Sequence, residues 1–121
     1  MEPVVLPDEY VFVSASEGEL SKLWYSAMVR EAEGLSLVVK RTVADDAGLA
    51  YDTVQAWITL TVQSSLEAVG FTAAFAGALG EAGISCNVIA GLRHDYILVP
   101  IARKADAVAT LRQLGRAATD F

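Results

Sequence analysis

Short apolar stretches, several of them alternating with polar residues, recur along the chain and predict β-strands. The predicted strands cover residues 10–15, 24–30, 35–40, 56–62, 84–90 and 96–100. The second and third of these flank a short turn that ends in Gly34, which is typical of a β-hairpin. Residues 1–8, with prolines at positions 3 and 7, are expected to form an extended lead-in to the first strand.

Apolar residues at helical spacing predict a long helix that runs from Ser64 to about Glu81. Ser64 is the expected N-cap, and Glu67 stands three residues later, where it completes a capping box. Gly83 is the expected end of the helix. The predicted core face contains Phe71, Ala74, Phe75, Ala78, Leu79 and Ala82. The opposite face contains Thr72, Ala73, Ala76, Gly77 and Gly80. These residues are small and uncharged, so either the other half of the chain or another subunit is expected to pack there.

Three further helices are predicted. A short helix covers residues 17–23, and a second short helix is expected to be capped by Thr42, with Asp45 at the capping-box position and Gly48 at its end. The last helix covers residues 102–117 and directs Val108, Leu111 and Leu114 inward.

The predicted elements repeat in one order. Strand, helix, strand, strand and helix follow one another in residues 10–50 and again in residues 57–117. We therefore expect an α+β fold of two ferredoxin-like halves, with antiparallel sheets and helices packed on one face. The halves are expected to cover residues 1–55 and 56–121 and to form one compact body. Each half lacks a final strand, so strand sharing or a continuous sheet is expected to satisfy the edges.

Composition and charge narrow the classes of function. Hydrophobic residues make up 54% of the 121 residues and the formal net charge is −6. Residues 1–55 carry 4 basic and 10 acidic side chains, whereas residues 56–121 carry 5 of each. No basic stripe suits nucleic acid, and no apolar run reaches the ~20 residues that span a bilayer, so neither nucleic acid nor a membrane is an expected partner. The single cysteine and the lack of a signal peptide predict a cytoplasmic protein.

Cys86 and His94 are the only pair that suggests nucleophilic chemistry. The sequence places no third group to orient them, so a small buried cysteine is the favoured interpretation. One histidine and one cysteine offer too few ligands for a metal site, and Asp95 is explained by a hairpin turn. No phosphate-binding or metal-binding motif is present. The expectation is a protein without catalysis, cofactor or metal.

The residues from 58 to 100 resemble ACT domains, and in particular the small stand-alone bacterial ACT-like proteins related to the CASTOR arginine sensors. The matching motifs are ITLTV at 58–62, SSLEAVG at 64–70, EAGISCNVIA at 81–90 and HDYILVP at 94–100. The stretch REAEGLSLVV at 30–39 resembles the hairpin that precedes the ACT unit in those proteins. The resemblance implies a degenerate first half and a complete ACT domain in the second half.

What the resemblance implies is a regulatory or sensor protein that binds an amino acid or a similar small metabolite, as a homodimer or higher oligomer. The ligand would lie at the turn after the first strand of the ACT unit. The residues implied there are Gln63, Ser64, Ser65, Leu66, Glu67, Val69 and Gly70, with Asn87, Ile89, His94 and Asp95 nearby. Gln63 stands where relatives often have histidine, and Leu92-Arg93 where they often have two aromatics. Arg93 would favour an anionic group.

Each of these residues also has a structural interpretation. Ser64 and Glu67 cap a helix, Gly70 allows close packing between helix and strand, and Asn87 is an inward amide bonded to backbone or water. Trp24, Trp57 and Tyr96 are assigned to packing in the core or at a subunit contact. The second candidate function is an assembly module without ligand, which uses the small face of the long helix. A small enzyme on the same fold ranks last.

Overall fold

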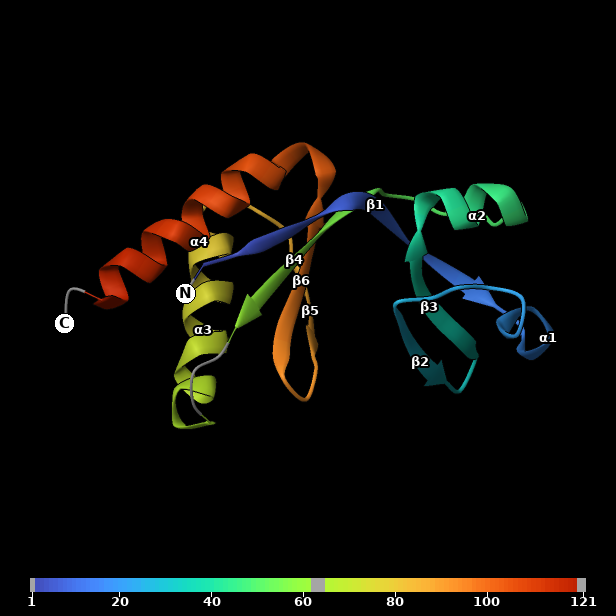
Figure 1. Cartoon of the computed structure of the whole chain (residues 1–121), viewed down its shortest axis with the longest axis horizontal. Helices are drawn as coiled ribbons and strands as arrows, with labels where there is room; N and C mark the ends of the chain where they lie inside the picture. Colours follow the sequence, from blue (N-terminus) through green and yellow to red (C-terminus); the bar gives the residue numbers. More distant parts are fainter. Residues whose placement is uncertain (1, 62–64, 120–121) are drawn as a thin grey trace. The chain divides into compact units, whose positions relative to one another are not determined.

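The computed structural model describes residues 2–61 and 65–119, and it describes their side chains except at 65–69 and 116–119. Strands and helices follow the predicted order twice (Figure 1). The first series is β1 (Val4–Ala15), α1 (Glu17–Leu20), β2 (Ala27–Glu31), β3 (Gly34–Lys40) and α2 (Arg41–Ala47). The second series is β4 (Gln55–Thr61), α3 (Ser65–Glu81), β5 (Asn87–Ala90), β6 (His94–Pro100), the short 3-10 helix η1 (Ile101–Arg103) and α4 (Lys104–Thr119).

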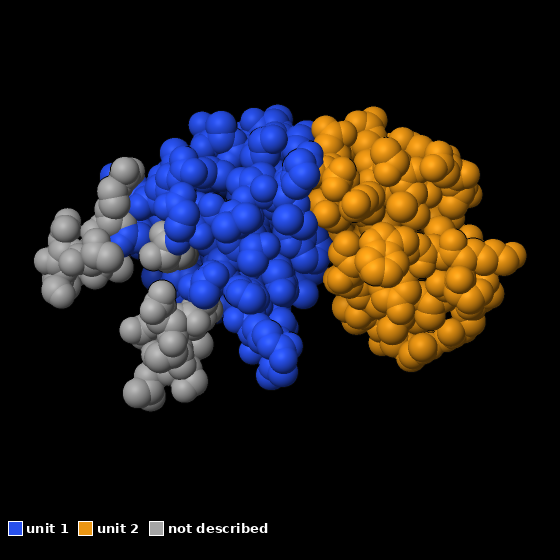
Figure 2. Space-filling view, in the orientation of Figure 1, with its two compact units in different colours: residues 1–7, 56–121 blue, residues 8–55 orange. Residues whose placement is uncertain are grey.

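One strand serves both halves of the fold. The strands are hydrogen-bonded in the order β2-β3-β1-β4-β6-β5. The chain divides into two compact units. We call residues 8–55 the first unit (orange, unit 2 in the key of Figure 2) and residues 1–7 with 56–121 the second unit (blue, unit 1 in the key). β1 crosses this division, so residues 4–7 belong to the second unit and residues 8–15 to the first. The expected lead-in at residues 1–8 is wrong in part, because its apolar residues from Val4 onward already form strand.

The first unit has its own core on one face of three strands. Val11 lies opposite Val39 and Val13 opposite Leu37 in the antiparallel β1–β3 pair. All four side chains are buried, and they pack with Ala44 of α2. The register thus places one apolar row of each strand under the helix, as period-2 alternation requires.

The caps of the two short helices differ from the sequence expectation. Ser16 and Glu19 form a complete capping box at α1, which ends at Leu20. The cap predicted at Thr42 is wrong, because β3 passes directly into α2 and makes Lys40 the N-cap, without a side-chain bond. Asp45 instead accepts a hydrogen bond from the hydroxyl of Tyr51 at 2.8 Å. The predicted stop is correct, since Gly48 has φ 69°, a left-handed conformation that suits glycine.

The second unit packs α3 and α4 on one face of its sheet (Figure 1). Phe75 and Leu79 of α3 meet Leu111 of α4 over the buried residues of β4 and β6. The fully buried sheet residues of this core are Ile58, Leu60, Ile97 and Val99. Both helices therefore cover the same face, and this arrangement is the predicted α+β architecture.

The orientation of α3 differs slightly from the predicted one. Ala74 and Ala82, assigned to the core face, are exposed, whereas Ala76, assigned to the opposite face, packs against the core. Phe71 and Phe75, whose ring centroids are 5.2 Å apart, turn this helix toward the row that contains Ala76. Alanine is small enough for either face, so its spacing could not decide the rotation. Among residues 70–81 of α3, the exposed ones are Gly70, Ala73, Ala74, Gly77, Gly80 and Glu81.

The three aromatic residues assigned to packing have different environments. Trp57 is buried, and its ring lies 5.2 Å from that of Tyr96. Trp24 is 73% exposed and precedes β2, which begins only at Ala27. The predicted strand 24–30 is therefore too long at its start, and Trp24 is not part of the core.

Hydrogen bonds from Arg103 join the end of α3 to the start of α4. Its Nη1 donates to the carbonyl of Gly83 at 3.2 Å and its Nη2 to the carbonyl of Ala82 at 3.1 Å. Its Nε donates to Asp106 at 3.1 Å. The last carbonyls of a helix have no partner within that helix, and a cation there also interacts favourably with the helix dipole.

We expect Arg103→Met to lower the free energy of unfolding by about 1–2 kcal/mol, because the aliphatic stem remains while the charged hydrogen bonds to the carbonyls are lost. Urea unfolding followed by circular dichroism measures this. Arg93→Met, at an exposed turn position, is the matched control and should change stability by less than about 0.5 kcal/mol. Equal stability of the two variants would contradict the role given to Arg103.

Candidate functional site

The turn between β4 and α3 is the centre of the predicted site. Gln63 and Ser64 lie outside the described residues, so the cap at Ser64 remains a prediction. Ser65, Leu66, Glu67 and Val69 fall in the beginning of α3, where the described structure is that of the backbone. Four further residues, Asn87, Ile89, His94 and Asp95, lie on the adjacent hairpin β5–β6.

Gly70 lies on the exposed side of α3. A Cβ built at this position has no described heavy atom within 4 Å. Close packing against the described strands therefore does not require glycine there. Contacts with the described chain therefore do not account for a residue that costs a helix interior roughly 1 kcal/mol relative to alanine.

The register of the β5–β6 hairpin separates the remaining candidates onto two faces. Asn87 lies opposite Leu98 and Ile89 opposite Tyr96, so both point to the face away from the helices. Asn87 is exposed, and the inward amide expected from the sequence is wrong. The preceding segment lacks regular strand pairing, so the strand begins at Asn87 rather than at residue 84.

Asp95 points to the other face, the one that carries the helices. It lies opposite Ala90 and alternates with Ile97, a member of the helix-covered core. The side chain belongs to β6, not to a turn, and the residue is only 8% exposed. It forms no ion pair with any residue that the structure describes. Among the described residues, the fully buried side-chain oxygen without a hydrogen-bond partner is Oε1 of Gln55, so Asp95 is a largely buried residue whose carboxylate is not a sealed group without a partner.

Figure 1 shows that β4 ends, and β6 begins, at the end of the sheet from which α3 starts. Asp95 is the second residue of β6. The buried carboxylate therefore lies at the same end of the sheet as the first turn of α3, on the face that this helix covers. Of the predicted residues on the hairpin, Asp95 is on the face that carries the helices, whereas Asn87, Ile89 and His94 are on the opposite face.

Cys86 and His94 are not arranged as nucleophile and base. Cys86 packs partly against the helix-covered core, whereas His94 alternates with Asp95 and belongs to the other face, 6.2 Å from the ring of Tyr96. Burial raises the pKa of the Cys86 thiol above its usual value, which disfavours the reactive thiolate. This environment is that of a structural cysteine.

A metal-binding cluster and a membrane-spanning helix are both absent from the described residues. No group of three or more potential metal ligands lies together among residues 2–61 and 65–119. No helix in the same part of the chain is long and apolar enough to cross a membrane.

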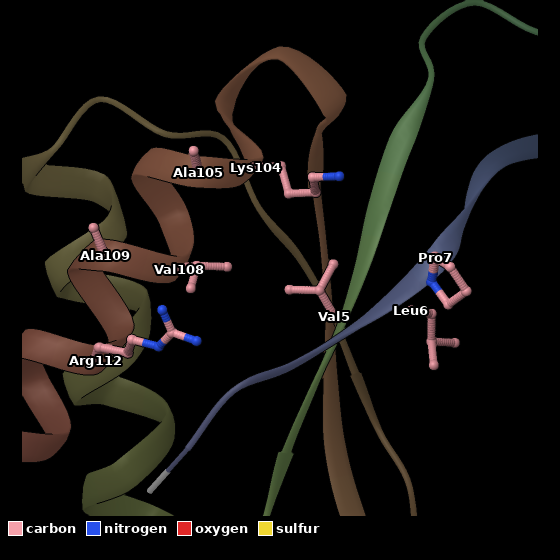
Figure 3. A pocket seen from close by; sticks show the side chains of 8 residues that line it. All are labelled: Val5, Leu6, Pro7, Lys104, Ala105, Val108, Ala109 and Arg112. Carbon is pink, nitrogen blue, oxygen red and sulfur yellow. The ribbon is translucent and has the colours of Figure 1, made fainter.

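Sequence reasoning missed a groove in the second unit. It has a volume of about 480 Å³ and lies between residues 5–7 of β1 and one side of α4 (Figure 3). The α4 residues that line it are Lys104, Ala105, Val108, Ala109 and Arg112. Lys104, Val108 and Arg112 follow the spacing i, i+4 and i+8, and Ala105 and Ala109 each stand one position later. The sequence predicts only an extended lead-in at the residues that face them.

Two ferredoxin-like repeats, each with helices on one sheet face and with one strand shared, define a class of small regulatory folds. Two descriptions of the ACT domain match the chain, one at residues 1–56 and one at residues 52–113. The chain belongs to the ACT domain family, and this membership supports a ligand-binding, regulatory role.

Solved structures agree with this assignment. A Vibrio cholerae protein of unknown function, described as a possible transport protein, is 41% identical with a TM-score of 0.86, over 93% of this chain and 88% of that one. The regulatory subunit of aspartate kinase from Thermus thermophilus in its ligand-free form is 10% identical with a TM-score of 0.67, over 93% and 95% of the two chains. The latter likeness concerns the fold alone. The comparison with curated proteins found no match.

We expect Cys86 in the folded protein to react with a disulfide reagent at pH 8 about tenfold or more slowly than in urea, because burial keeps the thiol protonated and partly covered. The absorbance of the released thiolate measures the rate. A folded protein that reacts as fast as the unfolded one would contradict the structural role of this cysteine.

Proposed function

We propose that this protein is a regulatory sensor that binds an amino acid or a similar small metabolite where β4 passes into α3, and that it performs no catalysis itself. The observation that carries this proposal is the largely buried residue Asp95, which faces the helices at the sheet end from which α3 starts. Membership of the ACT family supports it, since the family is a regulatory one.

The two ends of an amino acid match the two groups available. The first N–H groups of a long helix are unpaired within that helix and attract a carboxylate. The carboxylate of Asp95 would accept the ligand ammonium. Because Asp95 is largely shielded from water, this charged hydrogen bond would be stronger than at the surface. Ser65, Leu66, Glu67 and Val69, together with Gln63 and Ser64, would line the turn, and Gly70 would leave room for the backbone atoms of the ligand.

The side chain of the ligand would extend toward residues that set its identity. Arg93 is exposed in the turn between β5 and β6 and suits an anionic group. The proposal includes a kinship with the arginine sensors and a cytoplasmic location, where free amino acids are abundant and a lone cysteine stays reduced. Binding energy that differs between two conformational states would carry the signal.

We expect one or a few of the common amino acids, tested singly at millimolar concentration, to raise the thermal unfolding midpoint. A ligand at about 100 times its dissociation constant adds roughly 2.7 kcal/mol of stability. With the hit in hand, Asp95→Asn should weaken binding by about tenfold, the loss expected for one buried charged hydrogen bond. Asp106→Asn, at an exposed position of α4, is the control and should bind as the wild type does.

A pair of variants on α3 tests whether the ligand binds at the turn. Gly70→Leu should abolish the ligand-induced shift by filling the space beside the turn. Gly77→Leu, at an equally open position two turns along, should keep it. Unchanged affinity in a folded Gly70→Leu protein would show that the ligand binds elsewhere.

The exposed face of α3 favours a second candidate function, assembly through this helix. Cβ atoms built at Gly77 and Gly80 meet no described atom within 4 Å, so the described chain leaves this small, uncharged face uncovered. Ala76 packs partly against the core and is unsuited to test assembly, because arginine there would disturb folding.

If the small face of α3 joins subunits, Ala73→Arg should convert an oligomer to a monomer, since a buried unpaired charge is costly at an interface. Sedimentation velocity reports the species directly. The control is Ala47→Arg at an exposed position of α2, which should leave the sedimentation coefficient unchanged. An oligomer that persists in folded Ala73→Arg would exclude this face as the interface.

A further inference from the structure

The groove beside α4 has one wall of backbone and one wall of side chains. β3 pairs with β1 only from Tyr10 to Ala15, so within the second unit residues 4–7 form an edge strand next to β4. Pro7, which lacks an N–H group, is placed where an edge strand tolerates proline. In Figure 3, Val5 points from this strand toward Val108 of α4, while Leu6 points away. The backbone edge and the helix thus flank one open channel.

The floor of the groove is apolar and its two ends are cationic. Val5, Val108, Ala105 and Ala109 provide small apolar surface. Lys104 and Arg112 stand eight positions apart on α4, which corresponds to a rise of about 12 Å. Lys104 forms no ion pair in the described part of the chain.

Arg112 already holds a carboxylate in this structure. Its Nε donates to Oε1 of Glu2 at 2.8 Å, and this ion pair is exposed. That contact uses one of five N–H donors, and the others of the guanidinium remain for a second acceptor. Two cations in one groove are unusual on a chain of net charge −6, and they select for negative charge.

The dimensions favour an extended peptide over a compact molecule. A β-strand advances about 3.3 Å per residue, so carboxylates four residues apart in an extended peptide span about 13 Å, the separation of the two cations. Small apolar residues between them would face Val5 and Val108. Peptides that add to a free strand edge obtain affinity from backbone hydrogen bonds and specificity from alternate side chains.

We propose that this groove binds an extended peptide segment of another protein, with two acidic residues four positions apart and small apolar residues between them. The segment adds to the edge of β1 at residues 4–7, and its carboxylates pair with Lys104 and Arg112. This interaction is independent of the metabolite site at the start of α3 and gives the module a means to engage the protein that it regulates.

The test uses the full chain and the peptide acetyl-TEVAVET-amide. Amide chemical shifts in ¹H–¹⁵N spectra should move in a saturable way at residues 4–6 and 104–112. Two altered peptides serve as probes. Glutamine in place of both glutamates should weaken binding by about threefold or more, as expected for exposed ion pairs, and proline in place of the central alanine should abolish it by removing strand addition.

Two protein variants distinguish ion pairs inside the groove from the effect of the overall charge of the protein. Lys104→Glu should weaken binding of the acidic peptide by about threefold or more, and Arg93→Glu, the same charge change at a distant exposed turn, should leave the affinity unchanged. The proposal is overturned if both variants lose affinity equally, if the proline peptide binds as well as its parent, if glutarate alone produces the same saturable shifts, or if residues 4–6 and 104–112 do not respond.

Discussion

The shared strand β1 is the constraint on which the rest of the fold depends. A ferredoxin-like sheet needs a strand on each side of its first strand, and neither series of elements in this chain supplies all of its own. Residues 4–7 complete the sheet of the second unit, and the same strand then continues beside β3 in the first unit, where β3 lies between β2 and β1. A shift of one residue in the pairing register of β1 would turn its apolar side chains to the wrong face of the sheet in both units.

Much of this architecture follows from the sequence, because burial on one face produces clear periodicity. The rows of Val11 and Val13, and of Ile58 and Leu60, predict strands with the correct face inward. Periodicity does not predict the buried face of a helix where the residues are alanines, because they are small enough for either face. Alanines at positions 74, 76, 78 and 82 fit either side of α3, and only the two phenylalanines determine its rotation. The strand at residues 4–7 was missed because the prolines at 3 and 7 suggest a loop, whereas an edge strand accepts them.

The candidate site could be predicted from the sequence only in part. The turn before α3 is predicted from its capping pattern and from the family resemblance, and it remains a prediction because residues 62–64 lie outside the described residues. The burial of Asp95, which the sequence analysis names as a candidate ligand residue, could not be predicted, because an aspartate beside a histidine between two apolar runs resembles a hairpin turn. Its burial comes from tertiary packing: the strand begins two residues earlier than the pattern indicates, and α3 covers the face to which the side chain points. Arg112 and Val5 are 107 positions apart in sequence and share a groove only because β1 joins the second unit.

Arg103 couples the position of α3 to that of α4 in the second unit. α3 is a continuous helix of 17 residues, about 25 Å long. It begins near the end of the sheet at which β6 starts, and it is followed by the carbonyls to which Arg103 donates. A helix of this length moves as a rigid rod, so a tilt imposed at its first turn becomes a displacement at Ala82 and Gly83. The guanidinium passes that displacement to the first turn of α4, where Lys104 stands at one end of the groove. A tilt of α3 would therefore reach the first turn of α4 without any rearrangement of the sheet.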